Sequence, residues 1–183
     1  MSCGGLTAGR LRVFDSGMAV NAFLTFFDKA DGESIQRGKE KWVELLGWDW
    51  EIEAEVREGK GGGAKVGKPR PGKLSWEHYF DTSSAIVMGT LCNGKAFPQV
   101  ELQMTRTTGK AVPETYFTMR MESAYITKVS NSATEEGNVT QRCEMVFDVV
   151  TIEYRPLDNK SGALGPATTF NWDIPAGTAS PSA

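Results

Sequence analysis

Residues 48–56, WDWEIEAEV, alternate strictly between apolar and acidic side chains, and this pattern constrains the fold more than any other part of the sequence. Successive side chains of a β-strand point to opposite faces, so such alternation is typical of a half-buried strand and not of a helix. We therefore predict a strand over about residues 41–56, with Trp48, Trp50 and Ile52 in the interior of a β-structure. The opposite face, toward water, a lumen or an adjoining subunit, would carry Asp49, Glu51, Glu53 and Glu55.

Further runs rich in β-branched and aromatic residues lie along the chain between turn sequences, and they predict more strands. The exception is DTSSAIVMGTLCNGK, residues 81–95, which begins with candidate helix N-cap residues (Asp81, Thr82 or Ser83) and ends with Asn-Gly, a left-handed stop. Many strands and one helix predict a mainly β fold: an antiparallel β-barrel or sandwich of two sheets with one short flanking α-helix. The other expected strands are about residues 20–27, 73–80, 98–107, 115–130, 142–156 and 169–174.

The composition of the 183-residue chain fits one globular domain, with 40% hydrophobic residues, 10% aromatic residues and a net charge of −3. This mild charge gives no reason to expect a nucleic-acid partner. We expect a flexible N-terminal extension at residues 1–17, a folded domain at 18–174 and a flexible C-terminal tail at 175–183.

The three cysteines lie far apart without a CxxC spacing, which indicates reduced thiols in a cytoplasmic protein. With one histidine in the chain, these scattered cysteines also make a zinc site improbable. No segment reads as a cleaved signal peptide or as a membrane span. We expect cytoplasmic synthesis, no membrane insertion, and any secretion to proceed without a cleaved signal peptide.

Two sequence features resemble catalytic or nucleotide sites, and each lacks a required element. Residues 62–68 fit the GxxxxGK phosphate loop, but Pro69 follows where a Ser or Thr and a helix are needed. Glu77, His78 and Asp81 suit acid–base chemistry, yet neighbouring strand residues point to opposite faces and no nucleophile motif accompanies them. We expect His78 to be a partly exposed strand histidine.

The remaining candidates for chemistry also favour structural roles. Cys92, at the end of the apolar helix face, is expected to be a small buried thiol. The acidic residues of the predicted strand are too widely spread for a calcium or magnesium site. The sequence therefore predicts no enzyme activity, no cofactor and no bound metal.

Residues 57–73, REGKGGGAKVGKPRPGK, form a basic and Gly-rich segment without the aromatic residues that would stack on nucleic-acid bases. Such a long segment is either a flexible surface loop or a loop that becomes ordered on meeting a partner, and its charge would suit an acidic partner. Its basic residues are Lys60, Lys65, Lys68, Arg70 and Lys73.

The order of these segments resembles the haemolysin-coregulated protein (Hcp) family, the tube subunit of the type VI secretion system. The resemblance covers about residues 18–174. It rests on the ordered set of GES after the first strand, WVELLGWDWEIE, the strand–helix–strand segment around 74–105, and Tyr-Arg-Pro near the end. It implies a small barrel of two antiparallel sheets with one helix.

The same resemblance implies a structural function. Hcp subunits form hexameric rings that stack into a tube, carry effector proteins in the lumen, and act with the sheath and the spike of the secretion apparatus. They are made in the cytoplasm and secreted without a cleaved signal peptide. The loop after the second strand, here 57–73, reaches toward the neighbouring subunit or ring.

Two alternatives come from other classes of protein: a monomeric secreted effector, and a monomeric ligand-binding β-barrel whose tryptophans line a cleft. A particle with the mass of six protomers would favour the ring, and a monomer would favour the alternatives. We also hypothesise that acidic and basic patches on one subunit make head-to-tail contacts between copies, which grow by stacking.

Overall fold

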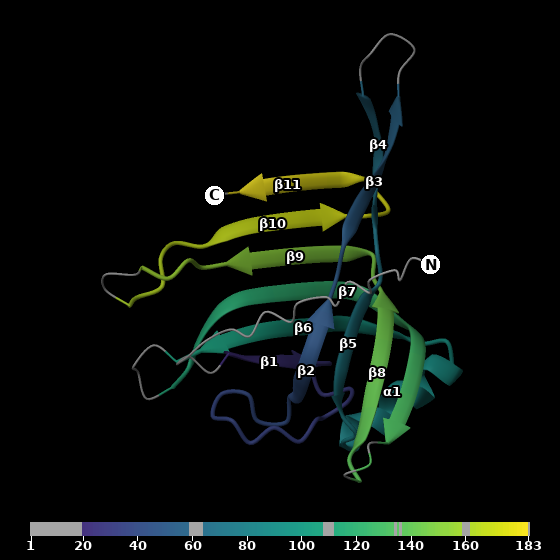
Figure 1. The fold of residues 1–183 in the computed structure, drawn as a ribbon, viewed down its shortest axis with the longest axis vertical. Coiled ribbons are helices and arrows are strands. Elements are labelled where there is room, and N and C mark those ends of the chain that lie inside the picture. The colour runs from purple at the N-terminus through teal and green to yellow at the C-terminus, as the bar shows by residue number, and fades with distance from the viewer. Residues whose placement is uncertain are drawn as a thin grey trace, which may run out of the picture.

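The computed structural model describes residues 20–58, 64–107, 112–133, 135, 137–158 and 162–182. The predicted N-terminal extension and Lys60 lie outside these residues. The described chain is mostly strand, with one helix, so the prediction of a mainly β fold with a barrel and a short helix is confirmed (Figure 1). The elements are β1 (Val20–Thr25), β2 (Val43–Asp49), β3 (Ile52–Glu58), β4 (Ala64–Pro71), β5 (Leu74–Tyr79), α1 (Thr82–Cys92), β6 (Ala96–Arg106), β7 (Glu114–Ala133), β8 (Val139–Val146), β9 (Val149–Tyr154), β10 (Thr168–Asp173) and β11 (Thr178–Ser182).

The main sheet closes on itself because β7 is long enough to pair on both of its halves. The strand order is β11-β10-β9-β7-β6-β1-β2-β5-β8, and a further pairing of β7 with β8 completes the barrel. Residues 117–122 of β7 pair with β9, whereas residues 125–133 pair with β8. All these pairings are antiparallel, and β9, β10 and β11 continue the sheet beyond the barrel as a wing (Figure 1).

Alternating side chains of the barrel strands form the core. On β6, Val100 and Leu102 are fully buried, and on the paired strand β7 the same holds for Met119 and Met121. Burying an apolar side chain of this size contributes roughly 1.5–3 kcal/mol, so the register of these strands is firmly set.

Helix α1 begins and ends where its capping residues predict. The Asp81 carboxylate accepts a hydrogen bond from the backbone N–H of Ser83, and Gly94 follows the helix with a φ of +61°. The buried residues of the helix are Ser83, Ser84 and Val87, all in its first half. Cys92, in the last turn, is exposed. The prediction of a buried Cys92 is therefore wrong: in the last turn Leu91 packs against the core, whereas Cys92 is exposed.

The predicted strand 41–56 is in fact two strands that belong to different sheets. The break falls between β2 and β3, at Trp50 and Glu51. There the Trp50 indole N–H donates to the carbonyl of Gly72 at 3.2 Å, and the Gly72 N–H donates to the carbonyl of Glu51 at 2.9 Å. A Cβ on Gly72 would lie 2.7 Å from the Glu51 side chain, so a larger residue at this corner would displace that side chain.

Three other segments differ from the sequence-based expectation. Ala64–Pro71, within the segment predicted as a surface loop (57–73), form strand β4, which pairs with β3 in a separate two-stranded sheet. The expected strand 142–156 is divided into β8 and β9. Residues 178–182, within the predicted C-terminal tail, form β11 and pair with β10.

Candidate assembly surfaces

The β3–β4 hairpin projects from the barrel (Figure 1). One of its two faces is apolar and exposed. In the register of the hairpin, Val56 lies opposite Val66 and Ile52 opposite Pro71. Ile52, Val56 and Val66 are 45%, 65% and 70% exposed. The prediction that Ile52 fills the barrel interior is therefore wrong, because the chain has left the barrel wall before this residue.

The other two residues of that prediction do contact the core. Trp48 stacks on Phe117 with ring centroids 5.4 Å apart, and Trp50 packs at a tilt against Phe147 at 5.8 Å. Both tryptophans are half-buried and pack against the buried cluster inside the barrel. The apolar face of the alternating segment thus reaches the interior up to Trp50 and no further.

Strand β4 brings three of the predicted basic residues together: Lys65, Lys68 and Arg70 are all exposed on the hairpin. Arg70 lies 3.4 Å from the carboxylate of Glu55 on β3. The Lys68 side chain extends to the wing: its Nζ lies 3.2 Å from the position that a Cβ atom on Gly177 would occupy. This contact places the β10–β11 turn against the hairpin.

Lys73 does not belong to this group, because it forms an ion pair within the barrel. Its Nζ lies 2.9 Å from the carboxylate of Glu144 on β8, and Lys128 contacts the same carboxylate at 3.2 Å. The hydrogen bonds from Lys73 and Lys128 lower the pKa of Glu144. We conclude that Lys73 ties the start of β5 to β8.

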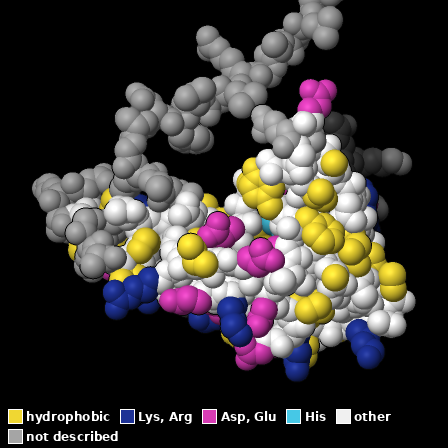
Figure 2. Space-filling view, turned by 90° about the horizontal axis from the view of Figure 1, so that it is seen from below, with side chains coloured by type: hydrophobic (Ala, Val, Ile, Leu, Met, Phe, Trp, Pro, Cys, Tyr) yellow, Lys and Arg dark blue, Asp and Glu magenta, His cyan; other side chains and the backbone are white. Residues whose placement is uncertain are grey.

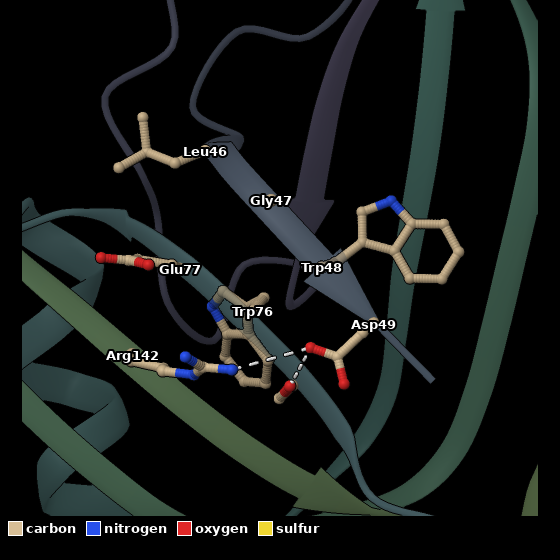
Figure 3. Close-up of a pocket in the computed structure, with 8 residues that line it drawn as sticks. Leu46, Gly47, Trp48, Asp49, Trp76, Glu77 and Arg142 are labelled. Carbon is tan, nitrogen blue, oxygen red and sulfur yellow. Dashed lines mark hydrogen bonds and ion pairs between the residues drawn. The ribbon is translucent and has the colours of Figure 1, made fainter. Parts of the chain in front are cut away.

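The prediction that the four acidic residues share one face of a single strand is wrong, because the chain bends between β2 and β3. Asp49 remains in the barrel wall, where it accepts a hydrogen bond from Ser75 and lies 3.8 Å from Arg142 (Figure 3). Glu51 lies at the corner, and Glu53 and Glu55 lie on the hairpin; all four acidic residues are exposed.

A hollow of about 210 Å³ surrounds the Asp49–Arg142 pair. Figure 3 shows that the side chains come from β2, β5 and β8. Gly47, which has no side chain, lies where the pairing of β2 with β5 shifts its register. The lining residues of the hollow are Leu46, Gly47, Trp48, Asp49, Ser75, Trp76, Glu77 and Arg142.

His78 is buried, at 1% exposure, so the prediction of a partly exposed histidine is wrong. Its Nε2 lies 3.2 Å from Ser84 Oγ and 4.0 Å from Asp81 Oδ1, while Nδ1 has no hydrogen-bond partner among the described residues. Burial lowers the pKa of His78, and the carboxylates of Asp81 and Glu77 oppose this shift only in part. The arrangement links the end of β5 to the first turn of α1.

Cys143, also in the interior, is held as a thiol. Burial raises its pKa to about 12. No group of three or more His, Cys, Asp or Glu side chains within the described ranges is placed to hold a metal ion. In the same part of the chain, no helix is long and apolar enough to cross a membrane.

A second hollow, of about 250 Å³, lies between the β1–β2 connection and the end of β5. Its residues come from separate segments that share no motif, so the sequence alone did not indicate it. It is lined by Glu33, Ser34, Ile35, Glu44, Tyr79, Phe80 and Asp81.

Comparisons with known proteins agree with one another. A family model described as "Type VI secretion system effector, Hcp" matches residues 23–157. Protein hcp1 of Pseudomonas aeruginosa is 26% identical over 158 residues, which cover 86% of this chain and 96% of the relative. The crystal structure of Hcp1 from Salmonella typhimurium superimposes with a TM-score of 0.71 at 27% identity, covering 88% of this chain and 99% of that one. Another solved structure, of a type six secretion system protein, has a TM-score of 0.80 over 88% of this chain and all of its own; at 23% identity it bears on the fold alone.

The closed barrel, its projecting hairpin and its exposed apolar surfaces define a small antiparallel β-barrel protein. Because the family model spans most of the chain, the protein belongs to the Hcp family of type VI secretion proteins. Hcp is a family of secreted, structural proteins rather than of enzymes, and membership supports a role as a tube protein of the secretion system.

Proposed function

We propose that this protein forms hexameric rings, that the rings stack into the inner tube of a type VI secretion system, and that the lumen carries effector proteins. The sheath and the spike would be its partners in the apparatus. Family membership supports this role. The observation that carries it is the β3–β4 hairpin, whose apolar face is exposed at Val56 and Val66 in the single subunit.

A two-stranded hairpin is marginally stable on its own, and exposed edge strands with apolar side chains promote contacts between chains. Among the described residues, the corner at Gly72 and the contact of Lys68 with the β10–β11 turn join this hairpin to the barrel and its wing. Packing against a neighbouring subunit or ring would remove its apolar face from water. Glu51 and Glu53 are further candidates for contacts in the lumen or between subunits.

The mass of the purified protein tests the ring. We expect a particle of about 120 kDa by mass photometry, six times the 20.0 kDa of the chain. The change Val66→Asp should weaken assembly, because it places a charge in the apolar face. The matched control is Val139→Asp, at a valine on β8 that is 42% exposed.

The outcomes separate the alternatives. A wild-type monomer at micromolar concentration would contradict the ring and favour the monomeric effector or the ligand-binding barrel. Equal loss of assembly in the two variants would contradict the role of the hairpin. Circular dichroism of both variants should match the wild type, because each change lies at an exposed side chain.

A further inference from the structure

The second hollow, lined by Glu33, Glu44 and Asp81 and called the acidic hollow from this point, lies at the end of the molecule opposite the projecting hairpin. In Figure 1 the β3–β4 hairpin rises at the top, while the β1–β2 connection and the end of β5 lie at the bottom. Viewed from below, acidic and hydrophobic side chains lie together in the middle of this face (Figure 2). At about 250 Å³ the hollow is smaller than typical small-molecule sites of about 300–1,000 Å³, and it has room for one or two protein side chains.

Hydrogen bonds hold two carboxylates of the hollow in place, and no basic side chain of the described residues pairs with them. Glu44 accepts a hydrogen bond from Ser34 Oγ at 2.9 Å, and Glu33 accepts one from the backbone N–H of Thr82 at 3.1 Å. Within the described ranges, neither carboxylate forms an ion pair. Asp81 adds a third negative charge, and no Lys or Arg lines the hollow. The hollow therefore contains carboxylates whose positions are fixed by hydrogen bonds.

Apolar side chains surround these carboxylates. Ile35 is 92% exposed, Tyr79 53% and Phe80 42%. Aromatic residues that frame a polar pocket are typical of protein contact sites, since they offer a large apolar area at a low entropic cost. The hollow thus fits a partner segment that combines basic and aliphatic side chains.

The β3–β4 hairpin has this composition. Lys65 and Lys68 form no ion pair within the described part of the chain, and Val56 and Val66 are exposed aliphatic residues of the same hairpin. The seven residues of β3, at about 3.3 Å per residue, reach roughly 23 Å from the corner at the barrel. Hairpin and hollow, at opposite ends of one subunit, cannot meet within that subunit.

We infer that the hollow is the acceptor for the hairpin of a second copy of this chain. Lys65 and Lys68 contact the carboxylates of Glu33 and Glu44, and Val66 packs near the aromatic rim. This inference rests on the proposed function and deepens it, because it names the acidic surface that the basic segment meets. A donor at one end and an acceptor at the other make a heterologous contact, which propagates along a stack.

The acidic residues of the alternating segment suit this role less well. Glu55 already lies beside Arg70 of its own hairpin at 3.4 Å, and Asp49 lies beside Arg142 of its own barrel at 3.8 Å. Their charges are thus partly neutralised before any partner arrives. Among the residues that the structure describes, no cation pairs with Glu33 or Glu44.

Charge reversal tests the contact from both sides. Glu33→Lys/Glu44→Lys and, separately, Lys65→Glu/Lys68→Glu should each reduce the fraction of protein that sediments as stacked tubes by about tenfold or more, with ring mass unchanged. Combining the four changes in one chain should restore stacking. Glu33→Gln/Glu44→Gln keeps both hydrogen-bond acceptors and should also weaken stacking. Glu122→Lys, at an exposed carboxylate of β7, is the matched control.

Disulfide cross-linking tests proximity even when stacking is weak. In a Cys3→Ser/Cys92→Ser background, protein with Lys65→Cys is mixed with protein carrying Glu44→Cys and oxidised. We expect a covalent dimer on non-reducing gels, and none when Glu122→Cys replaces Glu44→Cys.

The two readouts separate this inference from the proposed function. Rings and tubes that persist unchanged in Glu33→Lys/Glu44→Lys, without the covalent dimer, would overturn the inference and leave the tube intact. Absence of rings in the wild-type protein would overturn the proposed function, and the covalent dimer would then decide on the contact alone.

Discussion

Replacing Trp50 and Ile52 by alanine should have very different costs, although the two residues share a face in the alternating sequence. Replacing a fully buried tryptophan by alanine lowers the free energy of unfolding by about 3–5 kcal/mol. Trp50 is half-buried against Phe147, so we expect about 2 kcal/mol from lost packing and about 1 kcal/mol from the hydrogen bond to Gly72. Ile52 is 45% exposed on the hairpin, and its truncation should cost at most about 1 kcal/mol in the isolated subunit.

Urea unfolding followed by circular dichroism measures both values. The measurement is made at protein concentrations where the urea midpoint of unfolding no longer depends on concentration, because assembly would add stability by mass action. Trp50→Phe is the control, since it retains an aromatic contact with Phe147 and removes the indole N–H. It should cost clearly less than Trp50→Ala. Equal costs for the alanine changes at Trp50 and Ile52 would refute the bend between β2 and β3.

Two further predictions concern titratable groups in the interior. Because the pKa of His78 is lowered on folding, its contribution to stability is present above the unfolded-state pKa of about 6.5 and is lost as the pH falls toward the folded-state value. In that window the unfolding free energy should fall by up to about 1.4 kcal/mol per pH unit, and His78→Gln should flatten the profile; an unchanged profile would contradict this assignment. Cys92 should react with a maleimide in the native protein whereas Cys143, buried and with its pKa raised to about 12, should not, as peptide mapping by mass spectrometry will measure. Equal labelling of the two thiols would contradict the burial of Cys143.

Local sequence determined the class of fold and most of its elements. The barrel strands fall where β-branched and aromatic residues are concentrated, because side-chain alternation is a local property of an extended backbone, whereas β4 and β11 carry no such signal. The caps of α1 follow from Asp81 and Gly94, since capping depends on hydrogen bonds and backbone angles within a few residues. The ordered set of these segments was sufficient to indicate the Hcp family.

The tertiary structure alone decided where the alternating segment divides and which side chains meet. The bend after Trp50 depends on Gly72, more than twenty positions away in the chain, and it sends Ile52, Glu53 and Glu55 into the hairpin. Burial of His78 depends on the closure of the barrel and on the packing of α1. The acidic hollow joins segments around Glu33 and Phe80. Alternation fixes which side chains share a face of one strand, but not where that strand ends or which distant strand it joins, because those choices are made by long-range packing and hydrogen bonds.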